Sequence, residues 1–428
     1  MISHGVQREE STLDYRSMVN PTYLTAQSTL LMLAASGNAD AQEFIREMGI
    51  QEGIQRNQDQ SKPSPISEAD RKALMVGASL AVEARYAAIS RVLENEGYKS
   101  VLDIACGYTP RSLYCYKAGI DYVGMEIPVV AEQMQAFAQK KYQDLKHPAY
   151  VGGDATNAAS LKAAADLLDG ELFISSEGLM QYLSADEAEQ FIGGIRQVLS
   201  EHGGAWYSSD WNVDYQQFST RNMTSPEGVK YYNETRRQIM KSSNVFNEGV
   251  SFLSEDEKQA FLESHGLKVE KLPFYYGDEN LAMLRAVAPD KMDAIMDQFK
   301  KSSFWKMTLD PSSTAREKIA GAKEVDNLHI DCSAEGSRLI CRIAGRIDTI
   351  SGPALLEALE KNGDGFDELS VDAEKLEYLS SAGLRVFLIA SKKFGKVSVH
   401  NASDAVKEIF AASDSDQQIS VGMQNNVN

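Results

Sequence analysis

The chain has 428 residues, of which 43% are hydrophobic and 24% charged, and its formal net charge is −18. This length predicts two or three domains, and the composition is that of an ordinary globular protein. A surface this acidic repels phosphate backbones and anionic lipid, which argues against nucleic acid and membranes as partners. The N-terminus lacks a basic segment followed by an apolar one, and no run of about 18 apolar residues occurs. We therefore expect a cytoplasmic protein.

Cysteine usage points the same way. The four cysteines lie among apolar neighbours and form no CxxC pair: Cys106, Cys115, Cys332 and Cys341. This pattern predicts buried free thiols in a reducing compartment rather than a disulfide framework or a metal site. We expect no bound metal.

Residues 1–70 read as helices followed by a connector. Apolar residues recur at helical spacing in LTAQSTLLMLAASG and again in DAQEFIREMGI. The stretch after them is polar and contains Pro63 and Pro65, as connectors often do. From Arg71 a long amphipathic helix is predicted to run to Gly97, a residue type that commonly ends helices.

From residue 99 the pattern changes to strands that alternate with helices. The predicted strands are SVLDIA, YVGME, AYVGGD, ELFISSE and GAWYSSD. Such alternation predicts an α/β fold with a doubly wound, mostly parallel sheet. A polar segment at 212–250 interrupts it, and LKVEKLPFYYG and LAMLRAVAP then read as a closing hairpin of strands. This α/β domain is expected to span 71–290.

Residues 291–326 are expected to be a linker, and a second, small α/β domain is expected at 327–421. It opens with two strands, LHIDCS and SRLICRIAGRID, around a Glu335-Gly336 turn. Helices and strands then alternate through GPALLEALEKNG, ELSVDAEKL, SSAGLRVFLIASKKFG, VSVHNA and DAVKEIFAAS. The tail at 422–428 is expected to be disordered.

The loop after the first strand of the larger domain, in VLDIACGYTPRSL, consists of small residues. Such a loop lets backbone amides approach a nucleotide at the start of a helix. Dinucleotide enzymes need the pattern G-x-G-x-x-G, but the corresponding positions hold Ala105, Gly107 and Pro110, which is a poor match. S-adenosylmethionine has no phosphates, so its loop needs only one or two close approaches. That cofactor is also compatible with an acid at the strand end, where Asp103 lies.

Acids end three successive strands of the predicted sheet: Asp103, Glu126 and Asp154. The carboxyl edge of such a sheet is where ligands bind. Glu126, about 20 residues after the loop, is placed to accept hydrogen bonds from ribose hydroxyls. Asp154 is placed to accept from an adenine amino group. The alternative for each acid alone is that it caps the next helix.

The segments VLDIACGYTPRSL, YVGMEIPVVAEQ, VGGDAT and SSEGLMQYLSADEAEQFIGGI together resemble class I S-adenosylmethionine-dependent methyltransferases. Within that class the chain is most similar, over residues 75–290, to the leucine carboxyl methyltransferase-like group, whose members include O-methyltransferases of polyketides. The Glu-Gly-Leu-x-x-Tyr-Leu run from Glu177 to Leu183 is the most specific piece. The resemblance implies a methyltransferase fold and S-adenosylmethionine as cofactor.

The resemblance also implies roles for individual residues. Arg85 would contact the methionine carboxylate, and Glu177 would lie near the methionyl amine. The other implied contacts are Ala105 and Gly107 lining the cofactor, Glu126 at the ribose, and Asp154 with Ala155 around the adenine. An Asp-Thr-Arg sequence often follows the loop in this group, whereas Thr109-Pro110-Arg111 stands here, which leaves the role of Arg111 open.

The acceptor is predicted less directly. A carboxylate acceptor needs only a cationic clamp, whereas a phenol or alcohol needs a base. None of the six histidines lies in a cofactor motif, which favours an acceptor that is already ionised. We expect the N-terminal helices and the 212–250 segment to build its pocket, with these candidates: Tyr215, Arg221, Tyr232 and Arg236. The alternative is that this segment is only a solvated surface.

The C-terminal segments LICRIAGRIDTISGPALLEAL and YLSSAGLRV resemble the anti-sigma-factor antagonist (STAS) domain over 328–421. The resemblance implies a small sheet with helices on one side and docking onto a serine-kinase anti-sigma factor or a related partner. It also implies phosphorylation at Ser381 and partner contacts at Asp348 and Ser380. Many members have Asp where Ser380 stands, so the two serines are alternatively plain helix caps.

Two functions therefore stand at this point. The first is a methyltransferase, acting on the oxygen of a small-molecule acid or phenol, that carries a partner-binding STAS domain. The second is a regulatory protein that binds the cofactor as a sensor without turnover and acts through the STAS domain in an anti-sigma-factor partner switch.

Overall fold

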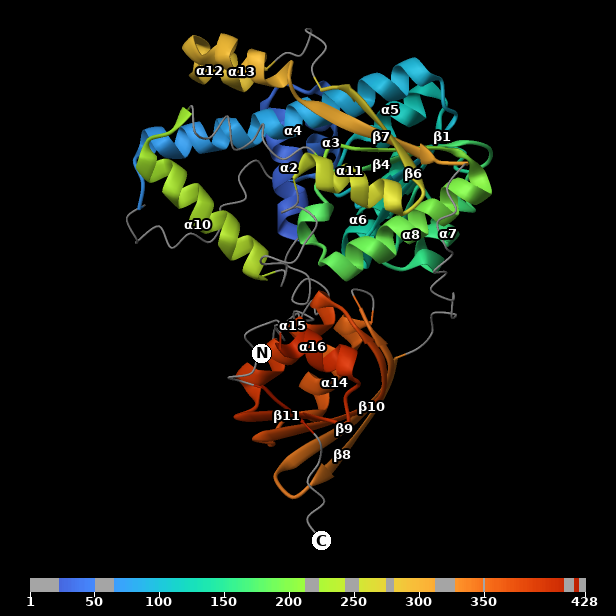
Figure 1. The fold of residues 1–428 in the computed structure, drawn as a ribbon, viewed down its shortest axis with the longest axis vertical. Helices are drawn as coiled ribbons and strands as arrows, with labels where there is room; N and C mark the ends of the chain where they lie inside the picture. The colour runs from blue at the N-terminus through green and yellow to red at the C-terminus, as the bar shows by residue number, and fades with distance from the viewer. Residues whose placement is uncertain are drawn as a thin grey trace, which may run out of the picture. The chain divides into compact units, whose positions relative to one another are not determined.

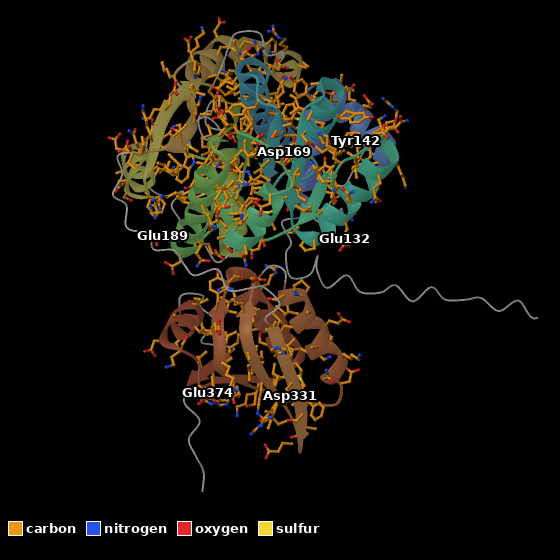
Figure 2. The ribbon with its side chains drawn as sticks, turned by 90° about the vertical axis from the view of Figure 1, so that its right-hand side faces the viewer. Glu132, Tyr142, Asp169, Glu189, Asp331 and Glu374 are labelled. Atoms are coloured by element: carbon orange, nitrogen blue, oxygen red, sulfur yellow. A yellow bond between two sulfur atoms is a disulfide. The ribbon has the colours of Figure 1, made fainter. Side chains whose placement is uncertain are left out.

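The computed structural model describes residues 23–50, 65–211, 223–242, 254–274, 281–311, 328–348, 351–411 and 419–422. The chain divides into two compact units, whose described parts lie within 23–311 and 328–422 (Figure 1). Figure 2 shows acidic side chains on the surface of both: Glu132 and Glu189 on the larger, Asp331 and Glu374 on the smaller.

Three helices open the larger unit: α2 Tyr23–Ala35, α3 Ala39–Met48 and α4 Glu68–Glu96. Asn38 caps α3, where its side chain accepts a hydrogen bond from the Ala41 N–H at 2.8 Å. Gly97 ends α4 in the left-handed conformation, as its position predicted. By length and composition α4 is the one described helix that could cross a bilayer. Since 61% of the apolar window is buried inside the unit, it has the pattern of a core helix.

The larger unit contains a seven-stranded sheet in the order β3-β2-β1-β4-β5-β7-β6. Five strands are parallel: β1 Ser100–Ile104, β2 Asp121–Glu126, β3 Tyr150–Gly152, β4 Leu172–Ser176 and β5 Gly204–Ser208. The helices between them are α5 Arg111–Ala118, α6 Pro128–Lys141, α7 Ala158–Ala165 and α8 Ala185–His202. This confirms the predicted doubly wound, mostly parallel sheet. The strand order reverses between β1 and β4, which is the switch point where such sheets bind ligands.

Side chains of the central strands alternate between two cores. Val101 of β1 packs into the core that α4 helps to form, whereas Leu102 and Ile104 pack into the core on the other face with α7 and α8. Covering both faces is typical of a parallel sheet, because its strands are then buried on both sides.

The closing strands differ from the expectation in two ways. β6 Leu267–Pro273 pairs with β7 Ser303–Leu309, not with the segment after it. That segment is the helix α12 Ala282–Val287, whose Leu284 and the preceding Leu281 are buried at helical spacing. The first part of the expected linker at 291–326 instead forms a helix and a strand of the larger unit. Within it, Met292–Phe299 forms α13, and β7 fills the place between β5 and β6 because its Phe304, Trp305 and Met307 are buried.

The described residues between β5 and β6 include the helices α10 Pro226–Ser242 and α11 Glu255–Ser264. The start of α10 is tied to α4: the N–H and the hydroxyl of Ser225 donate to the two carboxylate oxygens of Asp70 at 2.7 and 2.8 Å. The polar segment predicted at 212–250 thus contains a helix that packs on α4.

The smaller unit has a five-stranded sheet in the order β12-β11-β10-β9-β8. β8 Leu328–Glu335 and β9 Arg338–Ile347 form the predicted antiparallel hairpin, and β10 Glu368–Leu379, β11 Lys396–His400 and β12 Ile419–Gly422 follow in parallel. The helices α14 Gly352–Asn362, α15 Ser381–Lys393 and α16 Asp404–Ala411 lie on one face of the sheet (Figure 1). The rest of the predicted tail, 423–428, lies outside the described residues.

The prediction of four free thiols is wrong for two of them. Cys106 and Cys115 are free and buried, but Cys332 and Cys341 form a disulfide. These two residues stand directly opposite each other in the β8–β9 register, with Cα atoms 4.3 Å apart. Strand pairing brings the two sulfurs together, although no motif in the sequence marks them.

Candidate functional site

The loop after β1 has the backbone of a ligand-approach turn. Ala105 and Gly107 both adopt left-handed conformations, with φ of 52° and 54°. Glycine does this freely, but a residue with a Cβ loses roughly 1–2 kcal/mol. Strained backbone of this kind concentrates at functional sites. On the same loop, the Thr109 hydroxyl is buried and has no hydrogen-bond partner among the described residues. The loop that the sequence singled out therefore has both strain and an unused polar group.

Glu126, at the end of β2, holds this loop in place. One carboxylate oxygen accepts from the Gly107 N–H at 2.8 Å, and the other accepts from the Ile127 N–H at 2.8 Å. Burial raises the pKa of Glu126, while these two N–H groups oppose the rise. A carboxylate oxygen has room for a second donor. Glu126 can therefore receive two further hydroxyl donors without giving up its present bonds.

A buried arginine joins the ends of β1 and β4. Arg111 is 1% exposed, and its guanidinium donates to Asp103 at 2.8 Å and forms a short ion pair with Glu177. Its charged end also lies over the ring of Tyr86, 5.1 Å from the centroid. Burial by itself would lower the pKa of Arg111, but the charges of Asp103 and Glu177 hold it well above the ordinary value. The residue whose role the sequence left open is thus a fixed cation at the switch point.

The Asp103 carboxylate accepts several hydrogen bonds from neighbouring side chains. Besides Arg111, it accepts hydrogen bonds from the hydroxyls of Ser175 at 2.7 Å and Tyr122 at 3.1 Å. Because the carboxylate is buried and accepts three hydrogen bonds from within the protein, Asp103 orders the strand ends. It would act on a ligand through Arg111 and Glu177.

Glu177 lies between two arginines. The Arg85 Nε of α4 is 3.6 Å from one of its oxygens, and Arg111 contacts the other. Arg85 is the more accessible of the two cations, since its side chain is 18% exposed while that of Arg111 is 1% exposed. The site thus offers an accessible cation beside an acid, which matches the ammonium and carboxylate of an amino acid.

A further acid at the strand ends was missed in the sequence. Asp210 follows β5 and accepts hydrogen bonds from three consecutive backbone N–H groups, those of Gly178, Leu179 and Met180, at 2.6, 2.8 and 3.1 Å. Burial raises the pKa of Asp210, and these bonds oppose the rise. The turn that carries Glu177 is therefore anchored by Asp210. The signal was present, because GAWYSSD ends in an acid as the other strands do.

Asp154 and Ala155 follow β3, next to Glu126. The Gly153 N–H donates to the Glu126 backbone carbonyl at 2.9 Å, which places the two strand ends side by side. The Asp154 carboxylate is buried and accepts from the N–H and hydroxyl of Thr156 at 2.8 and 2.7 Å. Ala155 is half-buried against the core. The structure thus brings these residues to the same edge as the loop.

The acceptor candidates are only partly described. Tyr215 and Arg221 lie outside the described residues. Tyr232 lies on α10 and is half-buried, and Arg236 belongs to the same helix, although the placement of its side chain is not described. Tyr232 and Arg236 thus both lie on α10, the helix that packs on α4.

In the smaller unit, the residues expected to contact a partner make local hydrogen bonds. The Ser380 hydroxyl accepts from the Gly383 N–H at 3.1 Å and caps α15. Asp348 accepts from the N–H of Ser351 at 3.0 Å and from its hydroxyl at 3.1 Å. Both side chains are buried. Ser381 is the first residue of α15, and its side chain lies outside the description.

The family comparison decides the nature of the smaller unit. Residues 318–423 match the family model described as "Mlab, STAS domain". This segment is a STAS domain. Among solved structures, an anti-sigma factor antagonist from Mycobacterium paratuberculosis is 20% identical over 24% of this chain and 93% of its own, with a TM-score of 0.23.

Other solved structures match a larger share of the chain. A duf574 family protein from Streptomyces avermitilis is 14% identical over 63% of this chain and 95% of its own, with a TM-score of 0.39. Magnesium protoporphyrin IX methyltransferase from Synechocystis, solved with bound SAM, is 14% identical over 46% of this chain and 76% of its own, with a TM-score of 0.26. A search among curated proteins found no match. At these identities and TM-scores we transfer no ligand or residue role from the neighbours.

Proposed function

We propose that the larger unit binds S-adenosylmethionine and transfers its methyl group to a small-molecule acid or phenol. The observation that carries this proposal is Glu126, which lies beside the switch point and ties down the loop through Gly107. Its carboxylate keeps acceptor capacity for two ribose hydroxyls. The loop also lacks the glycine pattern that a pyrophosphate needs.

The other residues would hold the rest of the cofactor. Arg85 would pair with the methionyl carboxylate, and Glu177 would accept from the methionyl ammonium. Asp154 and Ala155 would lie at the adenine, next to Glu126. Arg111, Asp103 and Asp210 would keep Glu177 in position. This arrangement is supported by the charge pairing of Arg85 with Glu177 at 3.6 Å.

The bound cofactor supplies a methyl group that is already activated by the sulfonium, so the protein's work is alignment and exclusion of water. An acceptor carboxylate would need a cation to orient it and no base. Arg236, on α10, is our candidate for that cation, with Tyr232 of the same helix beside the acceptor.

We further propose that the STAS domain docks a protein partner, a serine-kinase anti-sigma factor or a related protein. Ser381 would be the regulated residue, because it begins α15, where backbone N–H groups and the helix dipole stabilise a phosphate. A dianion there would repel an acidic partner surface. Exposure of Ser380 and Asp348 to a partner would need the local bonds around them to rearrange.

Calorimetric titration with S-adenosylmethionine tests the cofactor proposal. Glu126→Ala should weaken binding by about 1–3 kcal/mol, since hydrogen bonds to a charged group are lost. Glu132→Ala, which removes an exposed acid on α6, should bind like the wild type. Tighter binding of a nicotinamide dinucleotide than of S-adenosylmethionine would overturn the proposal.

Turnover separates the two candidate functions. With a panel of small carboxylic acids and phenols, a methyltransferase should release S-adenosylhomocysteine. The STAS match at 318–423 fits both functions, and the second is a cofactor sensor that acts through a partner. Tight cofactor binding with no release of S-adenosylhomocysteine across the panel would support the sensor.

A further inference from the structure

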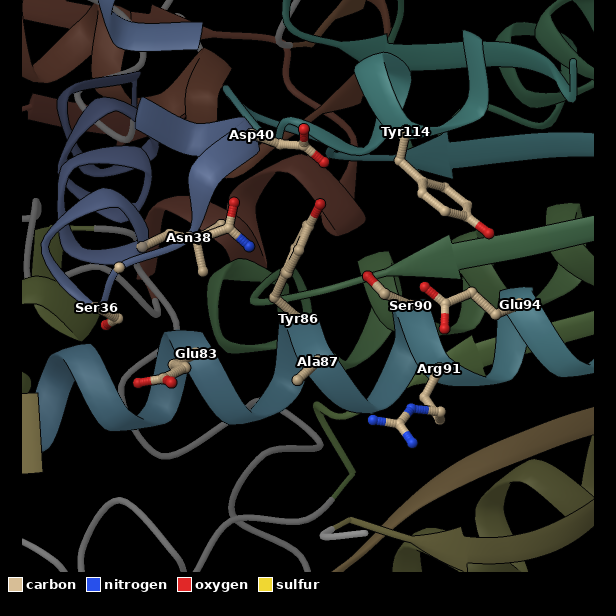
Figure 3. Close-up of a pocket in the computed structure, with 12 residues that line it drawn as sticks. Ser36, Asn38, Asp40, Glu83, Tyr86, Ala87, Ser90, Arg91, Glu94 and Tyr114 are labelled. Atoms are coloured by element: carbon tan, nitrogen blue, oxygen red, sulfur yellow. The ribbon is translucent and has the colours of Figure 1, made fainter. Parts of the chain in front are cut away.

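A cavity of about 300 Å³ lies in the larger unit, outside the candidate cofactor site except for one shared wall. Its walls are α4, the turn between α2 and α3, and Tyr114 of α5 (Figure 3). The shared wall is Tyr86, whose ring contacts Arg111. The cofactor residues of the strand ends do not line it.

The α4 wall is a polar stripe on a mostly buried helix. Glu83, Tyr86, Ser90 and Glu94 line the cavity, and their spacing of three, four and four residues puts them on one face of the helix. Glu83 is only 7% exposed and Tyr86 only 9%. One carboxylate oxygen of Glu83 accepts a hydrogen bond from the Leu281 N–H at 2.7 Å. The other buried polar groups of the stripe also need partners, because burying a polar group without a hydrogen bond is unfavourable.

Two hydroxyls on this stripe lack hydrogen-bond partners among the residues that the structure describes. Tyr86 makes no hydrogen bond with any described residue, and its only described polar contact is the one between its ring and Arg111. The Ser90 Oγ is buried and likewise has no partner in the described part of the chain. In Figure 3 both side chains point from α4 toward the α2–α3 turn and Tyr114. A ligand in the cavity would supply the missing partners.

The charge of the lining decides the class of ligand. Three carboxylates line the cavity, those of Asp40, Glu83 and Glu94. Asp40 is paired with Lys117 at 2.8 Å. The one lining cation, Arg91, extends to the other side of α4 in Figure 3. Glu94 lies at the exposed end of the stripe and forms no ion pair among the described residues. The cavity therefore favours a cation that donates hydrogen bonds.

The length of the stripe favours an elongated molecule. Glu83 and Glu94 are separated by eleven residues of α4, which is about 16 Å along the helix axis at 1.5 Å per residue. We propose that this cavity is a binding site for an elongated organic amine, with ammonium groups near Glu83 and Glu94 and donors along Tyr86 and Ser90. The site stands independently of the methyl-transfer proposal, because it uses no cofactor contact.

Spermine, spermidine and putrescine serve as probes of decreasing length, with a linear dicarboxylate as the control of opposite charge. Calorimetric titration of the full chain at physiological ionic strength should show binding that weakens from spermine to putrescine and is absent for the dicarboxylate. Because the whole protein is acidic, the variants must separate this cavity from the general surface.

Glu94→Gln and Tyr86→Phe should each weaken spermine binding about tenfold or more, since the first removes the negative charge opposite an ammonium group and the second removes a hydrogen bond to a charged ligand. Glu189→Gln makes the same charge change on exposed α8 and should leave binding unchanged. Thermal unfolding without ligand should be the same for Tyr86→Phe and the wild type, because that hydroxyl has no partner to lose. No amine binding, or equal weakening by Glu189→Gln, would overturn the proposal, and a lower melting temperature for Tyr86→Phe would make the hydroxyl structural.

Discussion

Arg111 forms an ion pair with Glu177, 66 residues further along the chain, and the pair joins the helix after β1 to the end of β4. This contact lies where the strand order of the sheet reverses. It makes a buried cation part of the candidate cofactor site, with Asp103 on its other side.

Arg111→Leu should destabilise the larger unit by about 3–5 kcal/mol, because it leaves Asp103 as a buried charge without its cation and leaves Glu177 with Arg85 as its one remaining ion-pair partner among the described residues. Urea unfolding measures this loss. As a control, Lys162→Gln breaks an exposed pair with Asp166 and Glu201 and should cost no more than about 1 kcal/mol. Equal effects of the two variants would show that the Arg111 network does not stabilise the fold.

Asp210→Ala should weaken S-adenosylmethionine binding although Asp210 is not expected to touch the cofactor. The change frees the N–H groups of Gly178, Leu179 and Met180 and releases the turn that carries Glu177. Loss of hydrogen bonds to a charged acceptor corresponds to about 1.5–3 kcal/mol. Titration calorimetry checks the affinity, with Asp169→Ala, an exposed acid, as the control. Unchanged affinity in Asp210→Ala would show that Asp210 does not position Glu177 for cofactor binding.

Cofactor binding should depend on the ionisation of Glu126. Its pKa is raised by burial, so the native protein holds this proton more tightly than the unfolded chain does. As pH rises from the ordinary glutamate range through the raised pKa, the contribution of this group to stability falls. Affinity for S-adenosylmethionine should rise over the same window, because the ionised carboxylate is the better acceptor for the ribose.

Glu126→Gln should remove this pH dependence. The wild type and the variant are each titrated with S-adenosylmethionine across the acidic range. Each affinity is expressed relative to that protein's own affinity at neutral pH. A wild-type profile as flat as that of the variant would mean that Glu126 does not ionise on binding.

Reducing the Cys332–Cys341 disulfide should lower the stability of the STAS domain and leave the larger unit unchanged. The cross-link spans 9 residues, and closing a loop of that size contributes about 2–3 kcal/mol at most. In calorimetric scans, adding reductant should lower the melting temperature of the STAS-domain transition and leave that of the larger unit unchanged. A Cys332→Ser, Cys341→Ser variant should be insensitive to reductant, and a shift in that variant would assign the effect elsewhere.

Ser381→Asp should reduce capture of a STAS-domain partner from native cell extract. The substitution adds a negative charge at the first residue of α15, and that charge must be desolvated when a partner docks there. Ser391→Asp, on the same helix but at its far end, is the control for added charge. If the wild type and Ser381→Asp recover the same proteins in the same amounts, Ser381 has no regulatory role and serves only as the first residue of the helix.

Much of the fold could be predicted because it rests on local patterns. Alternating apolar strands and amphipathic helices between 99 and 208 predicted the parallel sheet, since each pattern reports which face of an element is buried. The acids at the ends of β1, β2 and β3 could be found for the same reason: parallel strands bring their carboxyl ends to one edge. The YLSSAGLRV segment pointed to the STAS domain, which the family match then confirmed.

Other features depend on partners that are distant in sequence. The place of β7 between β5 and β6, the Cys332–Cys341 pair, and the capture of Arg111 by Glu177 all follow from which strands lie side by side. Asp210 looks like any acid after a strand until three N–H groups of the neighbouring turn are seen to converge on it. Tyr86 and Ser90 look like core positions of a helix until the α2–α3 turn is seen to form the opposite wall of a cavity in front of them. Hydrogen bonds and ion pairs form between whatever the packed chain brings within about 3 Å, and only the tertiary structure decides that.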